Sequence, residues 1–292
     1  MEKVGYAATI GMFDGVHRGH QFVLRQLVEQ AQLHHLRPLV ITFDRSPRQE
    51  QVLTPLDEKL RLIREMGIND IEVLLFTPEL KALTAREFME RELYGRLGVR
   101  LLMTGYDNRF GRNREEDFDD YVRYGRELGI DVLGMPAEGS VSSSQIRQLL
   151  TEGLVENATE CLGHRYTISG HVGHGQHIGT GLGFPTANLV PDDAQQLIPA
   201  TGAYAVSVLL SHPDGSSSTL HKGMMNIGTR PTFGGHETTL EVHILNHHEN
   251  LYGQSLSVAF VSRLREERRF DSAEALVQQL RHDAQKAESL IN

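Results

Sequence analysis

The sequence predicts an α/β domain built on a doubly wound parallel sheet, followed by a small antiparallel β-barrel domain with a C-terminal helix. In the first 150 residues, short apolar runs alternate with segments whose apolar residues recur at helical spacing. From about residue 165, strand-like runs follow one another through Gly-rich turns, which is typical of an antiparallel barrel. Helical periodicity returns only over residues 272–291. These observations predict two domains, residues 1–158 and 159–292.

In the first half, each apolar run is followed by a more polar segment with helical periodicity. The expected strands are 6–10, 38–43, 71–76, 99–104 and 130–133, and the expected helices are 21–33, 56–66, 84–97 and 118–128. The third of these helices begins with Thr84-Ala-Arg-Glu87, which has the spacing of a capping box. Strands that alternate with helices form parallel βαβ units, in which ligands bind beyond the carboxyl ends of the strands.

The second half begins with a helical linker over residues 152–163 and then changes character. The expected strands are 166–172, 202–210, 220–227, 238–245 and 256–264. Many short strands at even spacing predict a barrel rather than a second parallel sheet.

The composition is that of an ordinary globular protein. The 292 residues carry a net charge of −9, which argues against general nucleic-acid binding because such binding needs a basic surface. No run approaches the roughly twenty apolar residues of a membrane span, and no signal peptide precedes the first expected strand. Cys161 is the only cysteine, so no intrachain disulfide can form. We expect a cytoplasmic protein without membrane or nucleic-acid partners; its oligomeric state stays open, a weak homo-oligomer included.

The segment Gly11–His20, GMFDGVHRGH, joins the first expected strand to the first expected helix. A turn of this kind points backbone N–H groups and the positive helix end outward, which favours an anion. His17 and His20 are three residues apart and share a face of the first helical turn. Gly19 leaves room for a phosphate to approach the backbone. Two imidazoles at such a site can donate hydrogen bonds to charge that develops as a P–O bond breaks.

Three further segments contain candidate polar residues. A serine run, Ser142–Ser144, precedes Arg147 and predicts the N-cap of another helix. In Gly181–Leu189, GLGFPTANL, Thr186 and Asn188 are two residues apart, so on extended backbone their side chains point the same way. On the expected strand 238–245, Glu241 alternates with apolar neighbours and therefore faces away from the core. From spacing alone, a solvated glutamate on the barrel is the favoured interpretation of Glu241.

These segments carry a family resemblance over nearly the whole chain. GMFDGVHRGH resembles the H-x-G-H motif of the nucleotidyltransferase superfamily, and its Phe13-Asp14-Gly15 is similar to the adenylyltransferase half of bacterial bifunctional riboflavin kinase/FAD synthetases. The serine run with Arg147 resembles the signature that closes these domains. GFPTANL resembles the motif of riboflavin kinases. The resemblance implies a nucleotidyltransferase domain first and a riboflavin kinase barrel second.

For the first domain, the resemblance implies that FMN is adenylylated by ATP, its phosphate attacking the α-phosphorus as pyrophosphate leaves. His17, His20 and Arg147 are the implied catalytic residues, acting by positioning and charge stabilisation without a covalent intermediate. The residues implied to bind the nucleotide and its phosphates are Gly11, Phe13, Asp14, Gly19, Ser143 and Ser144. The residues expected to bind flavin are Asp107, Arg109 and Phe110, from a segment resembling G-x-D-F-x-F-G, and Arg263.

For the second domain, the resemblance implies phosphorylation of riboflavin to FMN by ATP. Thr186 and Asn188 are implied to hold Mg²⁺ and the ATP phosphates, which agrees with the preference of Mg²⁺ for oxygen ligands. Gly183 is expected to contact the nucleotide. Glu241 is the implied base, taking the proton of the riboflavin 5′-hydroxyl as that oxygen attacks the γ-phosphorus.

Two alternatives stay open. Asn108 stands where the family carries an aromatic residue, and the segment that follows has three acids, residues 115–117, and lacks the expected glycine. A protein with kinase activity alone and a degenerate or retargeted first domain is therefore one alternative. A flavin-binding regulator without turnover is the other, although it would need neither a base nor metal ligands. His171, His174 and His177 are spaced three apart but lie in a Gly-rich segment without cysteine, so we expect no zinc site there.

Overall fold

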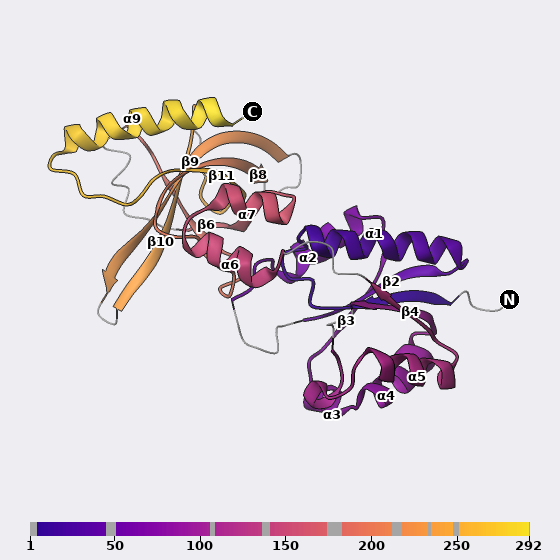
Figure 1. Ribbon diagram of the computed structural model, residues 1–292. Helices are drawn as coiled ribbons and strands as arrows, with labels where there is room; N and C mark the ends of the chain where they lie inside the picture. The colour runs from indigo at the N-terminus through magenta and orange to yellow at the C-terminus, as the bar shows by residue number, and fades with distance from the viewer. Residues whose placement is uncertain are drawn as a thin grey trace. The chain divides into compact units, whose positions relative to one another are not determined.

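The computed structural model describes residues 5–44, 51–105, 109–135, 141–173, 183–211, 218–232, 235–247 and 251–291. Contacts within the chain divide it into two compact units, Met1–Ser143 and Ser144–Asn292. Figure 1 shows a sheet with helices in the first unit and a barrel in the second. The expected boundary between residues 158 and 159 falls inside α7 (Val155–Leu162) and stays a prediction.

The first unit contains a five-stranded parallel sheet in the order β3-β2-β1-β4-β5, as predicted. Its strands are β1 (Tyr6–Ile10), β2 (Arg37–Phe43), β3 (Asp70–Leu74), β4 (Val99–Gly105) and β5 (Asp131–Met135). β1 lies at the centre of the sheet and pairs with β2 on one side and β4 on the other, so the direction of strand order reverses beside it. Because ligands of such sheets bind where the order reverses, the segment after β1 is at the favoured position for a site.

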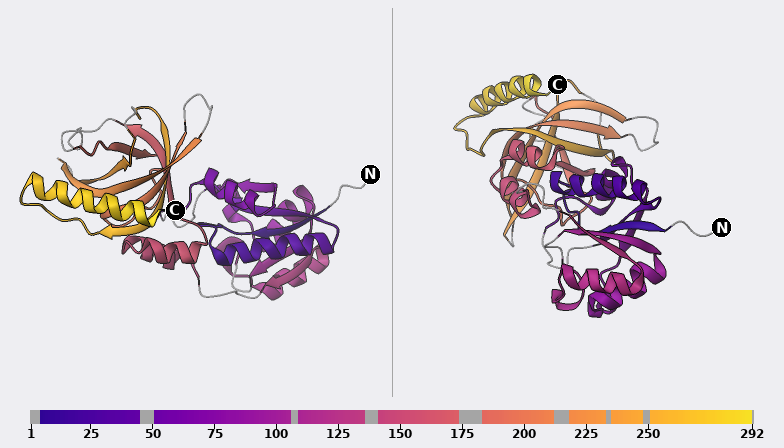
Figure 2. Two further views of the ribbon diagram at one scale, coloured as in Figure 1. Left: turned by 90° about the horizontal axis from the view of Figure 1, so that it is seen from above. Right: turned by 45° about the vertical axis from the view of Figure 1, so that its right-hand side comes forward.

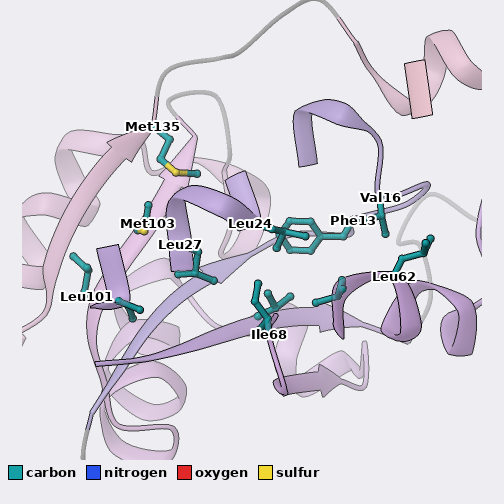
Figure 3. Packing of buried hydrophobic residues seen from close by; sticks show 13 residues of the cluster. Phe13, Val16, Leu24, Leu27, Leu62, Ile68, Leu101, Met103 and Met135 are labelled. Carbon is teal, nitrogen blue, oxygen red and sulfur yellow. The ribbon is translucent and has the colours of Figure 1, made fainter. Parts of the chain in front are cut away.

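Helices cover both faces of this sheet. Ala7 belongs to a hydrophobic cluster with the α1 and α2 side chains drawn in Figure 3, whereas Ala8 belongs to a second cluster with α4, η1 and α5. Adjacent residues of a strand point to opposite faces, so a sheet buried on both sides is the doubly wound arrangement that was predicted. The helices are α1 (Arg18–Leu33), α2 (Leu56–Glu65), α3 (Pro78–Ala82), α4 (Ala85–Phe88), the π-helix η1 (Met89–Arg96), the short 3₁₀ segment η2 (Arg112–Arg114) and α5 (Phe118–Leu128).

Two local features differ from the predicted elements. The single helix expected over residues 84–97 is α4 followed by the π-helix η1, although the capping box at its start is confirmed. There the Thr84 hydroxyl accepts a hydrogen bond from the Glu87 N–H at 3.2 Å, and the Glu87 carboxylate accepts one from the Thr84 N–H at 3.0 Å. Helix α3 was not predicted, but Thr77 as its N-cap and Pro78 at its first position are ordinary start signals.

The second unit is the predicted antiparallel barrel, closed in the order β10-β7-β6-β11-β8-β9. Its strands are β6 (Thr167–Gly173), β7 (Ala187–Pro191), β8 (Gly202–Ser211), β9 (Ser218–Thr232), β10 (Gly235–Ile244) and β11 (Ser255–Arg265). Short β7 is not among the predicted strands. The predicted C-terminal helix, α9 (Ala273–Leu290), lies along the barrel in Figure 2. Its Ala287 belongs to one buried cluster with Ala205 and Met224 of the barrel.

Helix α6 (Ser143–Thr151) begins at the predicted serine run, and α7 follows it before the barrel. None of the helices in the described residues combines the length and apolar character that a membrane crossing requires.

Candidate active sites in the two units

The loop after β1 has a strained backbone that the core holds in place. Phe13 and Val16 both have positive φ angles, 49° and 39°, which are uncommon for residues with a side chain. Their side chains are only 3% and 1% exposed and pack in the cluster of Figure 3. Burial of these two side chains therefore fixes a backbone conformation that the loop would not adopt by itself, as is typical of binding loops. Phe13, predicted to contact nucleotide, acts here mainly by packing.

His17 and His20 are stacked at the start of α1. Their ring centroids are 3.7 Å apart with 18° between the planes, and Phe13 meets the His20 ring edge-on at 5.2 Å. His17 is the N-cap of α1, and its Nδ1 accepts a hydrogen bond from the His20 N–H at 3.4 Å. A Cβ on Gly19 would lie 3.3 Å from His17 Nδ1, so glycine gives the ring the room it needs. The structure thus brings together the two predicted histidines and Gly19.

Both imidazoles are neutral near pH 7. Burial lowers the pKa of His17 to about 4, opposed by a backbone hydrogen bond. Burial also lowers the pKa of His20 well below its usual value, with further lowering from the charges of His17 and Lys59. Because His17 Nδ1 accepts a hydrogen bond, the proton of this neutral ring is on Nε2. The pair therefore suits hydrogen-bond donation to a developing anion rather than ion pairing.

Asp14 connects the loop after β1 to two other segments by hydrogen bonds. Its Oδ1 accepts hydrogen bonds from the N–H groups of Leu53 at 2.9 Å and Thr54 at 3.2 Å, just before α2. Its carbonyl oxygen accepts a hydrogen bond from the Ser143 hydroxyl at 3.0 Å. Ser144 and Arg147 lie farther along α6, in the part of the chain assigned to the second unit, and their contact with a triphosphate stays a prediction.

A cavity of about 520 Å³ lies at the carboxyl ends of the first unit's strands. Three residues predicted to bind ligand, Gly11, Arg109 and Phe110, line it, and their contact with nucleotide or flavin stays a prediction; Asp107 and Asn108 lie outside the described residues. Phe110 stacks on Tyr121 with the centroids 4.2 Å apart, which fixes its ring. Sequence reasoning missed the other aromatic and cationic side chains of this cavity: Phe43, Phe76, Phe88, Lys81 and Arg114. Phe43 and Phe76 are at the ends of apolar runs, a signal that could have found them.

The acidic segment at residues 115–117 has a structural explanation. Asp117 is the N-cap of α5 and forms a capping box with Asp120. A Glu116 carboxylate oxygen accepts a hydrogen bond from the Ala85 N–H at 3.1 Å, at the start of α4. Negative charge at helix N-termini is stabilising, so two of these three acids serve the fold of this domain.

In the second unit, Thr186, Asn188 and Glu241 line one cavity of about 300 Å³. Glu241 of β10 is in register with Asn188 of β7 on one side and with Asn226 of β9 on the other. The strand pairing therefore brings the predicted base and the predicted metal and phosphate ligands to the same place. Gly183 is described with a φ of 80° but is not among the lining residues.

The loop after β11 and helix α9 form a wall of this cavity that the sequence did not predict. Arg265 Nε donates to Asp283 Oδ2 at 2.8 Å, and Gln279 Nε2 donates to Asp283 Oδ1 at 2.6 Å. The guanidinium groups of Arg265 and Arg268 both lie over the Phe270 ring, at 5.5 and 4.8 Å from its centroid. These contacts fix the segment between β11 and α9 against the barrel.

Replacing Asp283 by alanine is expected to destabilise the second unit by about 3 kcal/mol, because it leaves the mostly buried Arg265 without its partner. The measurement is the urea-unfolding transition followed by circular dichroism. The control is Glu288→Ala, an exposed position on the same helix, for which a shift within about 0.5 kcal/mol is expected. Equal shifts for both variants would contradict a special role for the Arg265–Asp283 pair.

Arg263 does not line this cavity. Its guanidinium donates to the carbonyls of Thr201 at 2.7 Å and Glu152 at 3.3 Å, and it lies 6.0 Å from the Tyr204 ring centroid. These contacts attach the end of α6 to the barrel, which is a structural use of a residue predicted to bind flavin. Of the three spaced histidines, only His171 is described, with Nδ1 3.7 Å from an Asp192 carboxylate oxygen; His174 and His177 lie outside the described residues. Within the described ranges, no cluster of three or more His, Cys, Asp or Glu could hold a metal ion.

Comparisons with known proteins agree with this arrangement. The family model described as FAD synthetase matches residues 1–147, and the one described as Riboflavin kinase matches residues 162–291. The bifunctional riboflavin kinase/FMN adenylyltransferase of Escherichia coli strain K12 is 39% identical over 96% of this chain and 90% of its own length. The protein of the same name from Pseudomonas fluorescens is 38% identical over 99% of this chain and 94% of its own.

A solved structure from Streptococcus pneumoniae, titled a macrolide-efflux protein, has a TM-score of 0.87 at 28% identity and covers 99% of this chain and 95% of its own. The fold is therefore shared over both halves. Together with the two family matches and the two relatives, this establishes that the chain belongs to the bifunctional riboflavin kinase/FMN adenylyltransferase family, with its FAD synthetase half first and its riboflavin kinase half second.

Proposed function

We propose that this chain phosphorylates riboflavin to FMN in the cavity of the second unit and adenylylates FMN to FAD at the loop after β1, using ATP in both steps. The observation that carries the proposal is the placement of Glu241 opposite Asn188 across the β7–β10 pairing, in a cavity that Thr186 also lines. A carboxylate beside hydroxyl and amide oxygens suits phosphoryl transfer, whereas flavin binding alone requires none of them.

In the kinase step, Glu241 accepts the proton of the riboflavin 5′-hydroxyl as that oxygen attacks the γ-phosphorus and ADP leaves. Thr186 and Asn188 would hold Mg²⁺, because they supply oxygen donors to the same cavity and Mg²⁺ completes its coordination with water and phosphate oxygens. The ion would neutralise phosphate charge. The chain's own contribution is to position the hydroxyl against Glu241 and to hold the phosphates beside β7.

In the adenylyl-transfer step, the FMN phosphate attacks the α-phosphorus of ATP and pyrophosphate leaves. The neutral His17 and His20 donate hydrogen bonds to the charge that develops, together with the N-terminus of α1. We assign the phosphates of ATP to Ser143, Ser144 and Arg147. The 520 Å³ cavity would hold the flavin, its aromatic side chains stacking on the isoalloxazine and its cations facing the FMN phosphate.

Arg263 is left out of the proposed flavin site because both terminal nitrogens of its guanidinium already donate to backbone carbonyls. We further propose the functional limits 1–158 and 159–292, a cytoplasmic location and no nucleic-acid partner, in agreement with the net charge of −9.

The test is to incubate the protein with riboflavin, ATP and Mg²⁺ and to separate the flavins by chromatography over time. FMN that appears first and FAD that follows are the expected result. FMN without FAD would favour a kinase with a retargeted first domain, and would contradict the second step. Riboflavin that co-purifies but is never phosphorylated would favour a binding protein and contradict the first step.

A further inference from the structure

Lys59 is a buried cation at the carboxyl ends of two neighbouring strands. It lies in α2, with a side chain only 5% exposed. Its Nζ donates hydrogen bonds to the carbonyl oxygens of Met12 at 3.1 Å and Phe43 at 3.0 Å, which follow β1 and end β2. The Thr42 hydroxyl donates to the same Met12 carbonyl at 3.2 Å. One ammonium group therefore connects the histidine-bearing loop to the adjacent strand.

Helix α2 and this loop are joined at a second point. Asp14 accepts the two N–H groups of Leu53 and Thr54 immediately before the helix, while Lys59 reaches back from its second turn. The backbone between these points carries Phe13 with its positive φ. Two attachments, one from the segment just before α2 and one from α2 itself, therefore hold the loop in the conformation that presents His17 and His20.

A buried ammonium is costly, and a methionine or leucine would fill the same space without that cost. Burial lowers the pKa of Lys59 to about 8, although the carboxylates of Asp14 and Asp44 act in the opposite direction. The charge of Lys59 in turn contributes to the lowered pKa of His20. Asp14, Asp44 and His20 are thus the ionisable groups of the surrounding elements that interact electrostatically with this cation.

We propose that Lys59 is a positioning residue of the adenylyl-transfer site, which holds the loop after β1 by two carbonyls and supplies a fixed positive charge behind the paired imidazoles. The neutral imidazoles can donate hydrogen bonds to phosphate but cannot balance its charge. A cation held in the second turn of α2 provides that balance and adds to the effect of burial, which keeps His20 unprotonated. The inference depends on the adenylyl transfer proposed above.

The first test is Lys59→Met, which shortens the unbranched side chain by one atom and removes its charge and both hydrogen bonds. FAD formation from supplied FMN should fall by about tenfold or more, and the kinase step should be unchanged. In ¹⁵N-labelled protein, the imidazole resonances of His20 should titrate at a higher pH than in the parent, because the nearby positive charge is gone. The control is Arg61→Met, a charged position on the exposed side of the same helix, for which neither quantity should change.

Lys59→Arg retains the charge and should keep the low titration pH of His20. The parent protein gives an independent measurement if Lys59→Met does not fold. The ¹³Cε resonance of Lys59 should titrate near pH 8 rather than near the usual value of about 10.4, and FAD formation should fall over the same range while FMN formation does not. Unchanged FAD formation across the pH range in which the Lys59 resonance titrates would overturn the proposal, as would a folded Lys59→Met with normal FAD formation and unshifted His20. A parent that makes no FAD would instead overturn the proposed second step.

Discussion

Replacing Glu241 by glutamine is expected to lower riboflavin phosphorylation by roughly 10²- to 10⁴-fold, the usual contribution of a general base. Glutamine has the same shape and keeps the register of β10 with Asn188, but it cannot accept the proton of the 5′-hydroxyl. The loss should appear in kcat rather than in the KM for riboflavin, because the carboxylate acts on the reacting proton. The measurement is FMN formation by chromatography under saturating ATP and Mg²⁺.

Two comparisons make this result specific to Glu241. FAD formation from supplied FMN should be unchanged in the variant, since that step is assigned to the first unit. Glu267→Gln removes a second carboxylate that lines the same cavity, and a much smaller loss is expected there. Similar losses in both variants would attribute the effect to negative charge in the cavity and remove Glu241 from the role of base.

Alanine at His20 or at His17 is expected to lower FAD formation from FMN by roughly 10²- to 10³-fold, as removal of one preorganised donor does. The stacked rings act together, so the double variant should lose little more than either single variant. Riboflavin phosphorylation should persist in all three proteins. The parent rate should also stay high as the pH falls through 6.5, because the pKa of His17 is lowered to about 4 and the neutral form is retained there.

His34→Ala provides the matched control, because it changes an exposed histidine at the opposite end of α1. His20→Gln should recover part of the rate, since an amide can donate the hydrogen bond without being charged. Normal FAD formation in His17→Ala and His20→Ala would exclude the pair from the transition state. Loss of both activities would indicate that the substitution had unfolded the protein.

The features predicted correctly from the sequence are those that depend on residues close together in the chain. The alternation of strands with helices, the Thr84–Glu87 capping box and the succession of antiparallel strands in the barrel are all local signals, and each is confirmed, although β9 with 15 residues is longer than the expected strand 220–227. The sequence also predicted that Thr186, Asn188 and Glu241 serve one site, but only through the family motifs; in the structure they line one cavity. Spacing alone favoured a solvated Glu241.

What could not be predicted depends on contacts between elements far apart in the chain. By residue type alone, Lys59 is an ordinary charged residue of a polar helix. Leu62 and Ile63, three and four positions later, lie on the buried face of α2, and this spacing places Lys59 on the same face. That spacing was a usable signal for burial, but nothing local indicates that Met12 and Phe43 accept its hydrogen bonds. Asp283 is a similar case, since its partner Arg265 belongs to β11.

The closure of the barrel is uneven around its circumference. β10 is in register with β9 over ten residue pairs but with β7 over only two, Glu241–Asn188 and Val242–Ala187. Segments joined by few backbone hydrogen bonds open at the lowest free energy, so the amides of this seam should exchange with solvent hydrogen sooner than those of β8 or β11. The same seam carries the proposed base and phosphate ligands. Substrates that contact both β7 and β10 would supply the contacts that this short pairing lacks. Amide exchange in the barrel should therefore be slowest when substrate is bound.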